Sequence, residues 1–564
     1  MRIVLLSTPT RIYTPNYIIP TGIISLAAYL RQCGHEVRVV DAAALREPSG
    51  QIVRRVAEFE PELVGVGGII TAYAYIISIT RDLKRAMPKV PVVLGGQVAI
   101  NNEKNCFEHM AIDYIVHGYG EIALEKLARH VAGKLDLRHI PGISYREGSS
   151  IITNPGREFF PDINQMPLPA YELIDMEHYA TVNGHRHSKL QKYLNKTGKA
   201  AKNHRFATVM GTLGCTDRCT FCVHEQEFVG LKIFTSEYLV RHIRHLHEEY
   251  DINVFAVGEE MFITKVSRAR EFNALMKRQF PNLFWSASTR ADFVTPELIE
   301  ELQTGNCFYL AWGFESGSQK MLDIMKKRMS REQNMLAYTS TDNSSLVASC
   351  SLMVGNVGET NGTIGETVDA IRSAHIGRSA VFFAAAYPGG RTWDWAVERG
   401  IITDTHKYLL AASDKDAADR INVNLTPFPD FVLKAWQQVL MWECDQQEQR
   451  KDHMLFANAT WKRKLGLYLR YLLGQTYVPS PLLPMVLKAY FAYYSFTRKF
   501  FKTRKDRKYD YKVDAKGALL PDNLIVSTPQ QHLTPERFAV VIGKPKKTIM
   551  IGRPLETART AAAR

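Results

Sequence analysis

The stretch that decides the fold is FATVMGTLGCTDRCTFC, residues 206–222. Its first part, FATVMGT, carries no charge and is rich in apolar and small residues, which is typical of a short buried strand. Cys215, Cys219 and Cys222 follow this strand directly. The three cysteines are therefore predicted to lie on a loop at the carboxyl end of a strand, the position of active sites in β/α barrels.

Three thiolates at this spacing can hold three irons of a 4Fe-4S cluster and leave the fourth iron open. Zinc is the alternative ligand, because His224 lies two residues after Cys222 and zinc sites with three cysteines and one histidine exist. Zinc ligands normally come as two separated pairs, so the cluster is the favoured interpretation. The chain has 8 cysteines in all; so few suit a reducing cytosol better than a disulfide scaffold.

The cysteine loop belongs to a series of six apolar segments, each separated from the next by an amphipathic stretch. Such a series predicts a partial (β/α)6 TIM-like barrel, which we place at residues 201–400. The six segments are FATVMGT, NVFAVGE, FWSAST, FYLAWGF, LVASCSLMVG and AVFFAAAY.

Residues 1–140 also alternate short apolar segments with helical patterns, and five parallel strands are predicted there. This pattern is typical of an α/β doubly wound sheet of the Rossmann-like, flavodoxin type, whose ligand lies outside the carboxyl ends of the strands. Glycines follow the third, fourth and fifth predicted strands, and they let a bulky ligand approach the backbone closely. These candidate binding residues are Gly67, Gly68, Gly95, Gly96, Gly118 and Gly120.

The remaining segments differ in composition. Residues 141–200 are rich in Pro, Gly and charge and are predicted to form a connector. Residues 401–564 are predicted to be mainly helical. Their last part, 451–564, holds 22 Lys and Arg against 7 Asp and Glu, so the net charge of +14 belongs to this region.

The basic C-terminal region includes Lys499–Lys512, where cations alternate with Phe and Tyr. This composition fits contact with anionic lipid headgroups, and a solvated helix face is the alternative. No nucleic-acid-binding motif accompanies it, so we expect no nucleic-acid partner. Neither a signal peptide nor a membrane-spanning segment is predicted. We expect a cytoplasmic protein, with peripheral contact at the inner face of the membrane left open.

The loop Cys-x3-Cys-x-aromatic-Cys, in which Phe221 is the aromatic residue, resembles the radical S-adenosylmethionine (SAM) superfamily. The resemblance implies that the open iron of the 4Fe-4S cluster binds the amino and carboxylate groups of SAM and that a 5′-deoxyadenosyl radical forms. Similar segments at the second, third and fourth barrel strands imply further residues at the SAM site. They are Gly258, Glu259, Glu260, Ser288, Arg290 and Glu315.

The first domain resembles the cobalamin-binding domain that precedes the barrel in one large radical SAM subgroup. The segments that carry this resemblance are IPTGIISLAAYLRQCGHEVRVVDA, VVLGGQ and DYIVHGYGE. The family's Asp-x-His-x-x-Gly signature is absent, and the corresponding loop begins Thr8-Pro9-Thr10. The resemblance implies bound cobalamin without a histidine ligand, and a domain that has lost its cofactor is the alternative.

Together the two resemblances imply a cobalamin-dependent radical SAM enzyme that methylates an unactivated carbon. A non-methylating radical SAM enzyme, such as an anaerobic tetrapyrrole cyclase or another oxidation or rearrangement enzyme, is the first alternative. A non-catalytic zinc-binding scaffold is the second. The resemblance further implies a small-molecule or lipid-like substrate and an electron donor such as flavodoxin or ferredoxin. Residues that act directly on the substrate cannot be identified in the sequence.

Overall fold

The computed structural model describes most of the chain up to residue 451. The described residues are 1–10, 18–180, 184–201, 203–223, 230–258, 261–413, 420–451, 512–513 and 519–520. The basic segment Lys499–Lys512 lies outside these ranges except for its last residue.

A seven-stranded sheet forms the first part of the molecule, in the order β2-β1-β3-β4-β5-β6-β7. The first five strands of the chain are parallel, as predicted. Their bounds are β1 (Arg2–Ser7), β2 (Glu36–Asp41), β3 (Leu63–Gly67), β4 (Val92–Gly95) and β5 (Tyr114–Val116). The order reverses between β1 and β3, which defines the doubly wound fold and directs a ligand to the carboxyl ends of these strands.

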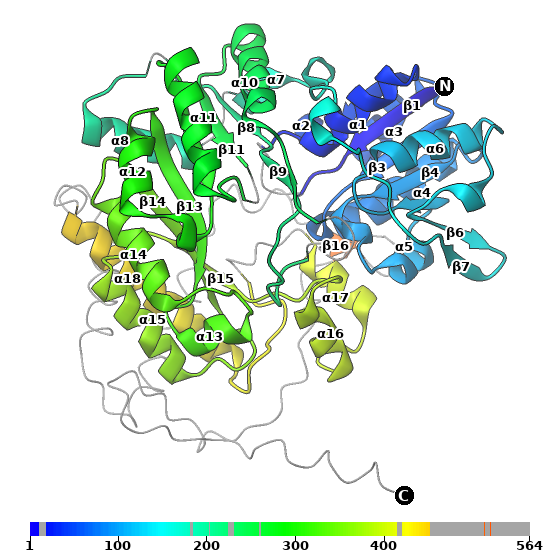
Figure 1. The fold of residues 1–564 in the computed structure, drawn as a ribbon. Coiled ribbons are helices and arrows are strands. Elements are labelled where there is room, and N and C mark those ends of the chain that lie inside the picture. The colour runs from blue at the N-terminus through cyan, green and yellow to red at the C-terminus, as the bar shows by residue number, and fades with distance from the viewer. Residues whose placement is uncertain are drawn as a thin grey trace, which may run out of the picture.

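Helices cover both faces of this sheet, because successive side chains of a strand point to opposite faces. Ile3 and Leu5 pack on one side with α1 and α6, whereas Val4 and Leu6 pack on the other with α3 and α4. The helices are α1 (Thr21–Gln32), α2 (Ala42–Leu45), α3 (Ser49–Ala57), α4 (Tyr73–Ala86), α5 (Glu103–His109) and α6 (Glu121–Val131), with short 3-10 turns η1 (Ile70–Ala72), η2 (Gln97–Ala99) and η3 (Leu137–His139). Figure 1 shows this unit in blue and cyan beside the green barrel.

The segment predicted as a connector contributes to both units. Its β6 (Ile143–Glu147) pairs antiparallel with β5, and β7 (Ser150–Thr153) extends the same sheet. These strands escape the sequence pattern because Gly148 divides them into two very short pieces. The elements that follow are η4 (Ile163–Gln165), η5 (Tyr171–Leu173), α7 (Met176–Ala180) and α8 (Gly184–Thr197).

A six-stranded parallel sheet, in the order β15-β14-β13-β12-β11-β8, confirms the predicted partial barrel. All six predicted strands are present in it. They are β8 (Phe206–Val209), β11 (Val254–Val257), β12 (Phe284–Ser288), β13 (Cys307–Glu315), β14 (Val347–Val354) and β15 (Ala380–Phe383). Since the strands are parallel, all their carboxyl ends lie at one edge of the sheet. Strand β8 leads into the cysteine loop, so this loop lies at that edge.

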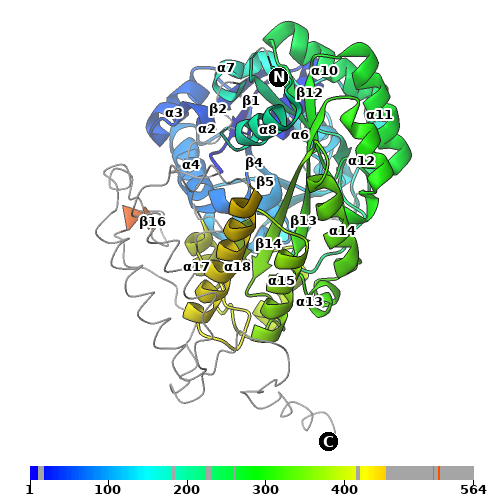
Figure 2. The ribbon, with the colours of Figure 1, turned by 90° about the vertical axis from the view of Figure 1, so that its left-hand side faces the viewer.

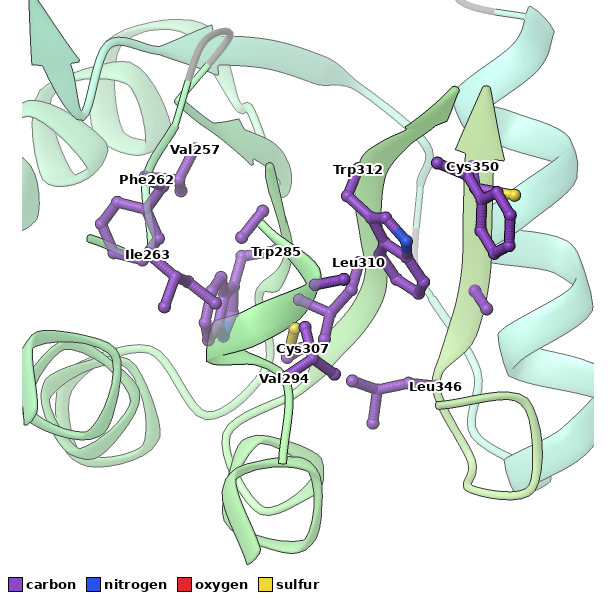
Figure 3. Close-up of a cluster of buried hydrophobic side chains, with 14 of the residues drawn as sticks. Val257, Phe262, Ile263, Trp285, Val294, Cys307, Leu310, Trp312, Leu346 and Cys350 are labelled. Atoms are coloured by element: carbon purple, nitrogen blue, oxygen red, sulfur yellow. The ribbon is translucent and has the colours of Figure 1, made fainter. Parts of the chain in front are cut away.

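Six helices and a 3-10 turn cover the outside of the barrel. They are α10 (Ser236–Tyr250), α11 (Val266–Gln279), η6 (Ala291–Phe293), α12 (Pro296–Gln303), α13 (Gln319–Ile324), α14 (Arg331–Asp342) and α15 (Asn361–Ser373). Thr235, Thr295 and Thr360 cap the first turns of α10, α12 and α15 with their side-chain oxygens. Figure 3 shows part of the core between strands and helices, including the aromatic side chains of Phe262, Trp285 and Trp312.

Helix α8 closes the amino end of the barrel. Leu190, Tyr193 and Leu194 pack against residues at or near the start of five barrel strands. These partners are Phe206, Val254, Phe284, Phe308 and Val347. The floor is therefore apolar, and any reactant must enter from the carboxyl edge.

The chain after the sixth strand returns to the first unit and then packs on the barrel through α18. Helices α16 (Arg391–Glu398) and α17 (Thr405–Ala412) share a hydrophobic core with the first sheet and α4. Helix α18 (Asp430–Lys451) lies along α15 and β15, as Figure 2 shows. A two-residue pair, β16 (Lys512–Val513) and β17 (Leu519–Leu520), completes the described elements. None of the described helices combines the length and apolar character needed to cross a bilayer.

Replacing Leu190 with Ala tests the role of the floor. Leu190 is fully buried, and we expect the substitution to lower the free energy of unfolding by about 2–5 kcal/mol. Gln191 is exposed on the same turn, and its replacement by Ala should change stability by less than about 0.5 kcal/mol. Chemical unfolding of the anaerobically purified chain measures both, and equal effects would contradict the packing role of Leu190.

Candidate active site

The cysteine loop follows a small hairpin above the carboxyl end of β8. Strand β9 (Thr212–Leu213) pairs antiparallel with β10 (Lys232–Ile233), and Gly214 leads from β9 into Cys215. Cys215, Cys219 and Cys222 form no disulfide and are partly exposed. Four of the remaining cysteines are buried, and Cys33 is exposed on another element. The only partly exposed thiols of the described chain thus lie together on this loop.

Cys219 and Cys222 flank one turn of the loop, where the Cys222 N–H donates to the Cys219 carbonyl at 3.1 Å. Among the described residues, no three metal-ligating side chains are already gathered as a metal site. Burial raises the pKa of Cys219 to about 12, while the ammonium of Lys327 acts in the opposite direction. Thiolates are the ligands that iron–sulfur clusters take, so the donor set, with a cation beside it, fits the cluster.

Asp217, between the first two cysteines, anchors the loop to the barrel. Its buried carboxylate accepts hydrogen bonds from Arg290, which follows β12, and from the Arg328 Nε at 3.0 Å. Arg328 also donates to the Thr216 carbonyl at 2.8 Å. Two guanidinium groups therefore hold the middle of the loop, and a buried pair of this kind is strongly destabilising to break.

A second set of contacts fixes the other side of the loop. The Thr220 N–H donates to the Met325 carbonyl at 3.0 Å. The Thr220 carbonyl accepts from both the N–H and the Oγ1 of Thr392, each at 2.9 Å. The loop is thus tied to the segment after α13 and to the first turn of α16, so three distant parts of the chain determine its shape.

Two glycines between β15 and α16 join the loop to the first unit. A Cβ on Gly390 would lie 3.3 Å from the Cys222 carbonyl oxygen, and one on Gly389 would lie 2.5 Å from a methyl carbon of Ile100. Ile100 follows η2, four residues after Gly96. The segment of Gly389 and Gly390 therefore lies between Ile100 of the first unit and the cysteine loop and adds no side chain of its own.

The predicted SAM residues occupy the carboxyl ends of successive barrel strands. Gly258 follows β11 with φ +75°, and a Cβ there would lie 2.7 Å from Phe262. Ser288 ends β12, and its carbonyl accepts the Phe262 N–H at 2.9 Å. Glu259 and Glu260 lie outside the described residues. The chain between β11 and β12 thus brings Gly258 and Ser288 together around Phe262.

Glu315 and Arg290 face the cysteine loop and are already engaged. Glu315, with φ +61°, accepts from the Lys327 Nζ at 2.9 Å. Burial lowers the pKa of Lys327, but Glu315 and Cys219 outweigh it, so the pKa is raised. The Lys327 ammonium also lies 5.9 Å from the centre of the Phe221 ring. Arg290 binds Asp217 and Asp292, so in this structure it supports the loop.

The glycines after β3 and β4 lie where neighbouring segments of the first unit pack closely. The Gly68 N–H points to the Gly95 carbonyl at 3.4 Å, and a Cβ on Gly96, where φ is +85°, would lie 2.6 Å from the Gly68 carbonyl oxygen. A Cβ on Gly67 would meet Ile23 at 2.7 Å. The structure thus brings the glycines after β3 and β4 together at the carboxyl edge of the sheet, which is where a doubly wound fold takes a ligand such as cobalamin.

The third glycine pair flanks the start of α6. Gly118 is exposed with φ +72°, which favours glycine, and Gly120 lies directly before Glu121. The loop after β1, where the family's histidine would stand, lies for the most part outside the described residues.

Several residues of the site escaped sequence reasoning. Asp217 stands inside the cysteine motif, but its partners are 73 and 111 positions away. Lys327 binds Glu315 across 12 positions. No local pattern encodes such pairs, and only the order of the barrel strands brings them together.

Two family models match the chain. Residues 9–128 match the B12 binding domain, and residues 209–371 match the radical SAM superfamily. The chain is 24% identical to an uncharacterised methyltransferase of Pyrococcus horikoshii, over 68% of this chain and 79% of the relative. It is also 24% identical to an anaerobic magnesium-protoporphyrin IX monomethyl ester cyclase of Rubrivivax gelatinosus, over 79% of this chain and 80% of the relative.

A solved structure has the same fold. The cobalamin-dependent SAM radical enzyme OxsB, with aqua-cobalamin and SAM bound, matches with a TM-score of 0.61 and 15% identity, over 92% of this chain and 77% of that chain. The fold, the cysteine loop and the two domain matches define a class of enzyme. The chain belongs to the radical SAM superfamily, in the group that carries an N-terminal B12 binding domain. Its cofactors are a 4Fe-4S cluster, SAM and cobalamin.

Replacing Asp217 with Ala tests the anchoring of the loop. The substitution leaves the buried Arg290 without one of its carboxylates, and the loss of a buried partner costs about 3–5 kcal/mol. We expect a chelator to remove iron from the reconstituted variant at least about tenfold faster than from the wild type.

Thr216→Ala is the matched control, because Thr216 is exposed and contributes only its carbonyl to the contact with Arg328. It should retain iron as the wild type does. Equal iron loss from both variants would show that the carboxylate of Asp217 does not hold the loop.

Proposed function

We propose that this enzyme transfers a methyl group to an unactivated carbon of a small-molecule or lipid-like substrate. The observation that carries the proposal is that Gly389 lies against Ile100 while the next residue, Gly390, lies against the carbonyl of Cys222. It brings the carboxyl edge of the cobalamin-binding sheet against the cysteine loop. A substrate between the two can be reached from both sides. The Pyrococcus relative, named a methyltransferase, supports the same conclusion.

The chain's own residues divide the work between the two edges. We propose that Cys215, Cys219 and Cys222 hold the cluster, and that backbone and side chains at the strand ends receive SAM. The SAM residues are Gly258, Glu259, Glu260, Ser288, Arg290 and Glu315. Cobalamin contacts the glycines after β3, β4 and β5, namely Gly67, Gly68, Gly95, Gly96, Gly118 and Gly120. When bound, the cluster with SAM supplies a radical that removes hydrogen, and cobalamin supplies the methyl group.

Several features of the barrel protect such a reaction. Leu190, Tyr193 and Leu194 seal the floor, and Asp217 keeps the loop in place against the barrel. A closed floor limits water to one entrance, which prevents side reactions of a reactive intermediate.

The cyclase relative supports a second candidate function. The alignment with this relative covers 79% of this chain, and the relative is named a cyclase and not a methyltransferase. A non-methylating radical reaction within the same fold is therefore the alternative, and the products derived from SAM distinguish the two.

The experiment uses the reduced holoenzyme with SAM that carries a deuterated methyl group, and the small-molecule and lipid fractions of the cells that produce the protein. We expect S-adenosylhomocysteine and 5′-deoxyadenosine to form together. A product heavier by one methyl group, with the deuterium label, should appear in mass spectra. Cys219→Ala is the control and should form no 5′-deoxyadenosine. Formation of 5′-deoxyadenosine without S-adenosylhomocysteine would favour the non-methylating alternative.

We also propose that an acidic one-electron carrier such as flavodoxin docks beside the cysteine loop. Three exposed cations lie next in sequence to residues that form or hold the cysteine loop. They are Arg218 within the motif, Lys326 after Met325, and Arg391 before Thr392. We name them the basic rim. Positive charge around a site attracts an acidic partner and speeds association.

The double variant Lys326→Glu and Arg391→Glu tests the basic rim without altering the motif. We expect the cluster to be reduced by flavodoxin roughly tenfold more slowly at low salt, while dithionite, a small reductant, should act at an unchanged rate. Lys277→Glu with Arg278→Glu, exposed on α11, makes the same charge change elsewhere. Stopped-flow absorbance measures the rate of cluster reduction in the wild type and in both double variants. Equal slowing of the two variants would contradict docking at the rim.

The proposal of peripheral membrane contact concerns the basic C-terminal region. That region, residues 451–564, lies outside the described residues apart from five positions, so the proposal rests on the sequence alone.

A further inference from the structure

The short segment between α13 and α14 lies along the cysteine loop and contacts it at two points. Near its start, the Met325 carbonyl accepts the Thr220 N–H at 3.0 Å. Three residues later, Arg328 donates to the Thr216 carbonyl at 2.8 Å. Lys327 stands between these two contacts. Its backbone is therefore fixed beside the loop that carries the three cysteines.

The side chain of Lys327 points into the site. Its ammonium lies 5.9 Å from the centre of the Phe221 ring and 2.9 Å from a carboxylate oxygen of Glu315. The side chains of this ion pair are buried, with 14% of Lys327 and 9% of Glu315 exposed. The neighbouring Lys326, in contrast, is exposed. Two consecutive lysines thus present one charge to the cysteine loop and the other to solvent.

Backbone strain accompanies this arrangement. Lys326 and Arg328 have φ of +53° and +50°, in the left-handed region that residues other than glycine adopt only when their surroundings hold them there. The Lys327 N–H donates to the Leu322 carbonyl at 2.9 Å, and Arg328 donates to Asp217 at 3.0 Å. The surroundings therefore keep Lys327 turned toward the cysteines.

The charges near the cysteines act unequally on Cys219. Asp217 is paired with two arginines, whereas Glu315 is paired with Lys327. Burial raises the pKa of Cys219; among the charged groups, the Lys327 ammonium has the largest effect, ahead of the two carboxylates, and it lowers this pKa. The ammonium therefore favours negative charge at this sulfur, although Glu315 lies beside it.

We propose that Lys327 raises the reduction potential of the iron–sulfur cluster, so that the one-electron carrier reduces it more readily. One electron passes from the carrier to the cluster, and no bond forms or breaks. The cluster is already negative through its thiolates, and its potential depends on the charge around it. A buried cation stabilises the added electron more than an exposed one, because little water screens it. The inference rests on the proposed cluster site at the three cysteines.

The experiment is a redox titration of the full chain, followed through the electron paramagnetic resonance of the reduced cluster. The chain is reconstituted with iron and sulfide, without SAM, and without cobalamin because cobalt(II) gives its own signal. We expect Lys327→Gln to shift the reduction equilibrium about tenfold toward the oxidised cluster, which is about 59 mV for a one-electron couple. Lys327→Arg keeps the charge and should stay within about threefold of the wild type.

Two further variants separate the effect of charge from that of structure. Glu315→Gln removes a negative charge but keeps an acceptor for the ammonium, so it should shift the equilibrium toward the reduced cluster. Lys326→Gln removes the adjacent exposed charge and should stay within about twofold of the wild type, because solvent screens that charge. If the ion pair only braced the loop, Lys327→Gln and Glu315→Gln would shift the potential in the same direction.

A wild-type potential in Lys327→Gln would overturn the proposal, and so would shifts of the same sign in Lys327→Gln and Glu315→Gln. Iron content shows whether each variant holds its cluster. If Lys327→Gln takes up no cluster, Glu315→Gln decides: a raised potential supports the proposal, and an unchanged or lowered one contradicts it. Absence of iron from the wild type would refute the proposed cluster site itself. Absence of a methylated product would refute only the proposed reaction.

Discussion

The close approach of two parallel sheets at Gly389 and Gly390 is the constraint on which the rest of the site depends. Each sheet presents the carboxyl ends of its parallel strands. Cobalamin takes the edge of one sheet, and the cluster with SAM takes the edge of the other. Both cofactors can reach one substrate only if the two edges lie close together. Glycine has no side chain, so the backbone there touches Ile100 on one side and the carbonyl of Cys222 on the other.

Different interactions stabilise the two edges. Ion pairs shape the cysteine loop, because Asp217 binds two arginines and Glu315 binds Lys327 in partly or fully buried surroundings. These charges hold a short irregular loop that has little hydrophobic contact of its own. The cobalamin edge has no comparable brace and depends on the absence of side chains, since Gly68 and Gly96 allow backbone to meet backbone. A cluster held by three thiolates needs a rigid loop, whereas a flat cofactor needs clearance.

Much of the fold could be predicted because its signals are local. Short apolar segments alternate with amphipathic ones, and each predicted strand of both sheets is present. The less regular parts could not be predicted in the same way. Strands β6 and β7 are only five and four residues long, and neither has a helix that follows it. The role of α8 as a floor and the return of α16 and α17 to the first sheet depend on which apolar faces remain uncovered, and this is a property of the assembled molecule.

The sequence by itself determined the class of chemistry, because cluster ligation requires three thiolates at a fixed local spacing and the glycines stand directly at the strand ends. Only the tertiary structure decided how this chemistry is supported. Arg290, expected at the SAM site, binds Asp217 from 73 positions away, and Lys327 binds Glu315 across 12 positions. Burial and long-range pairing are set by the packing of whole elements against one another, and no short stretch of residues carries that information.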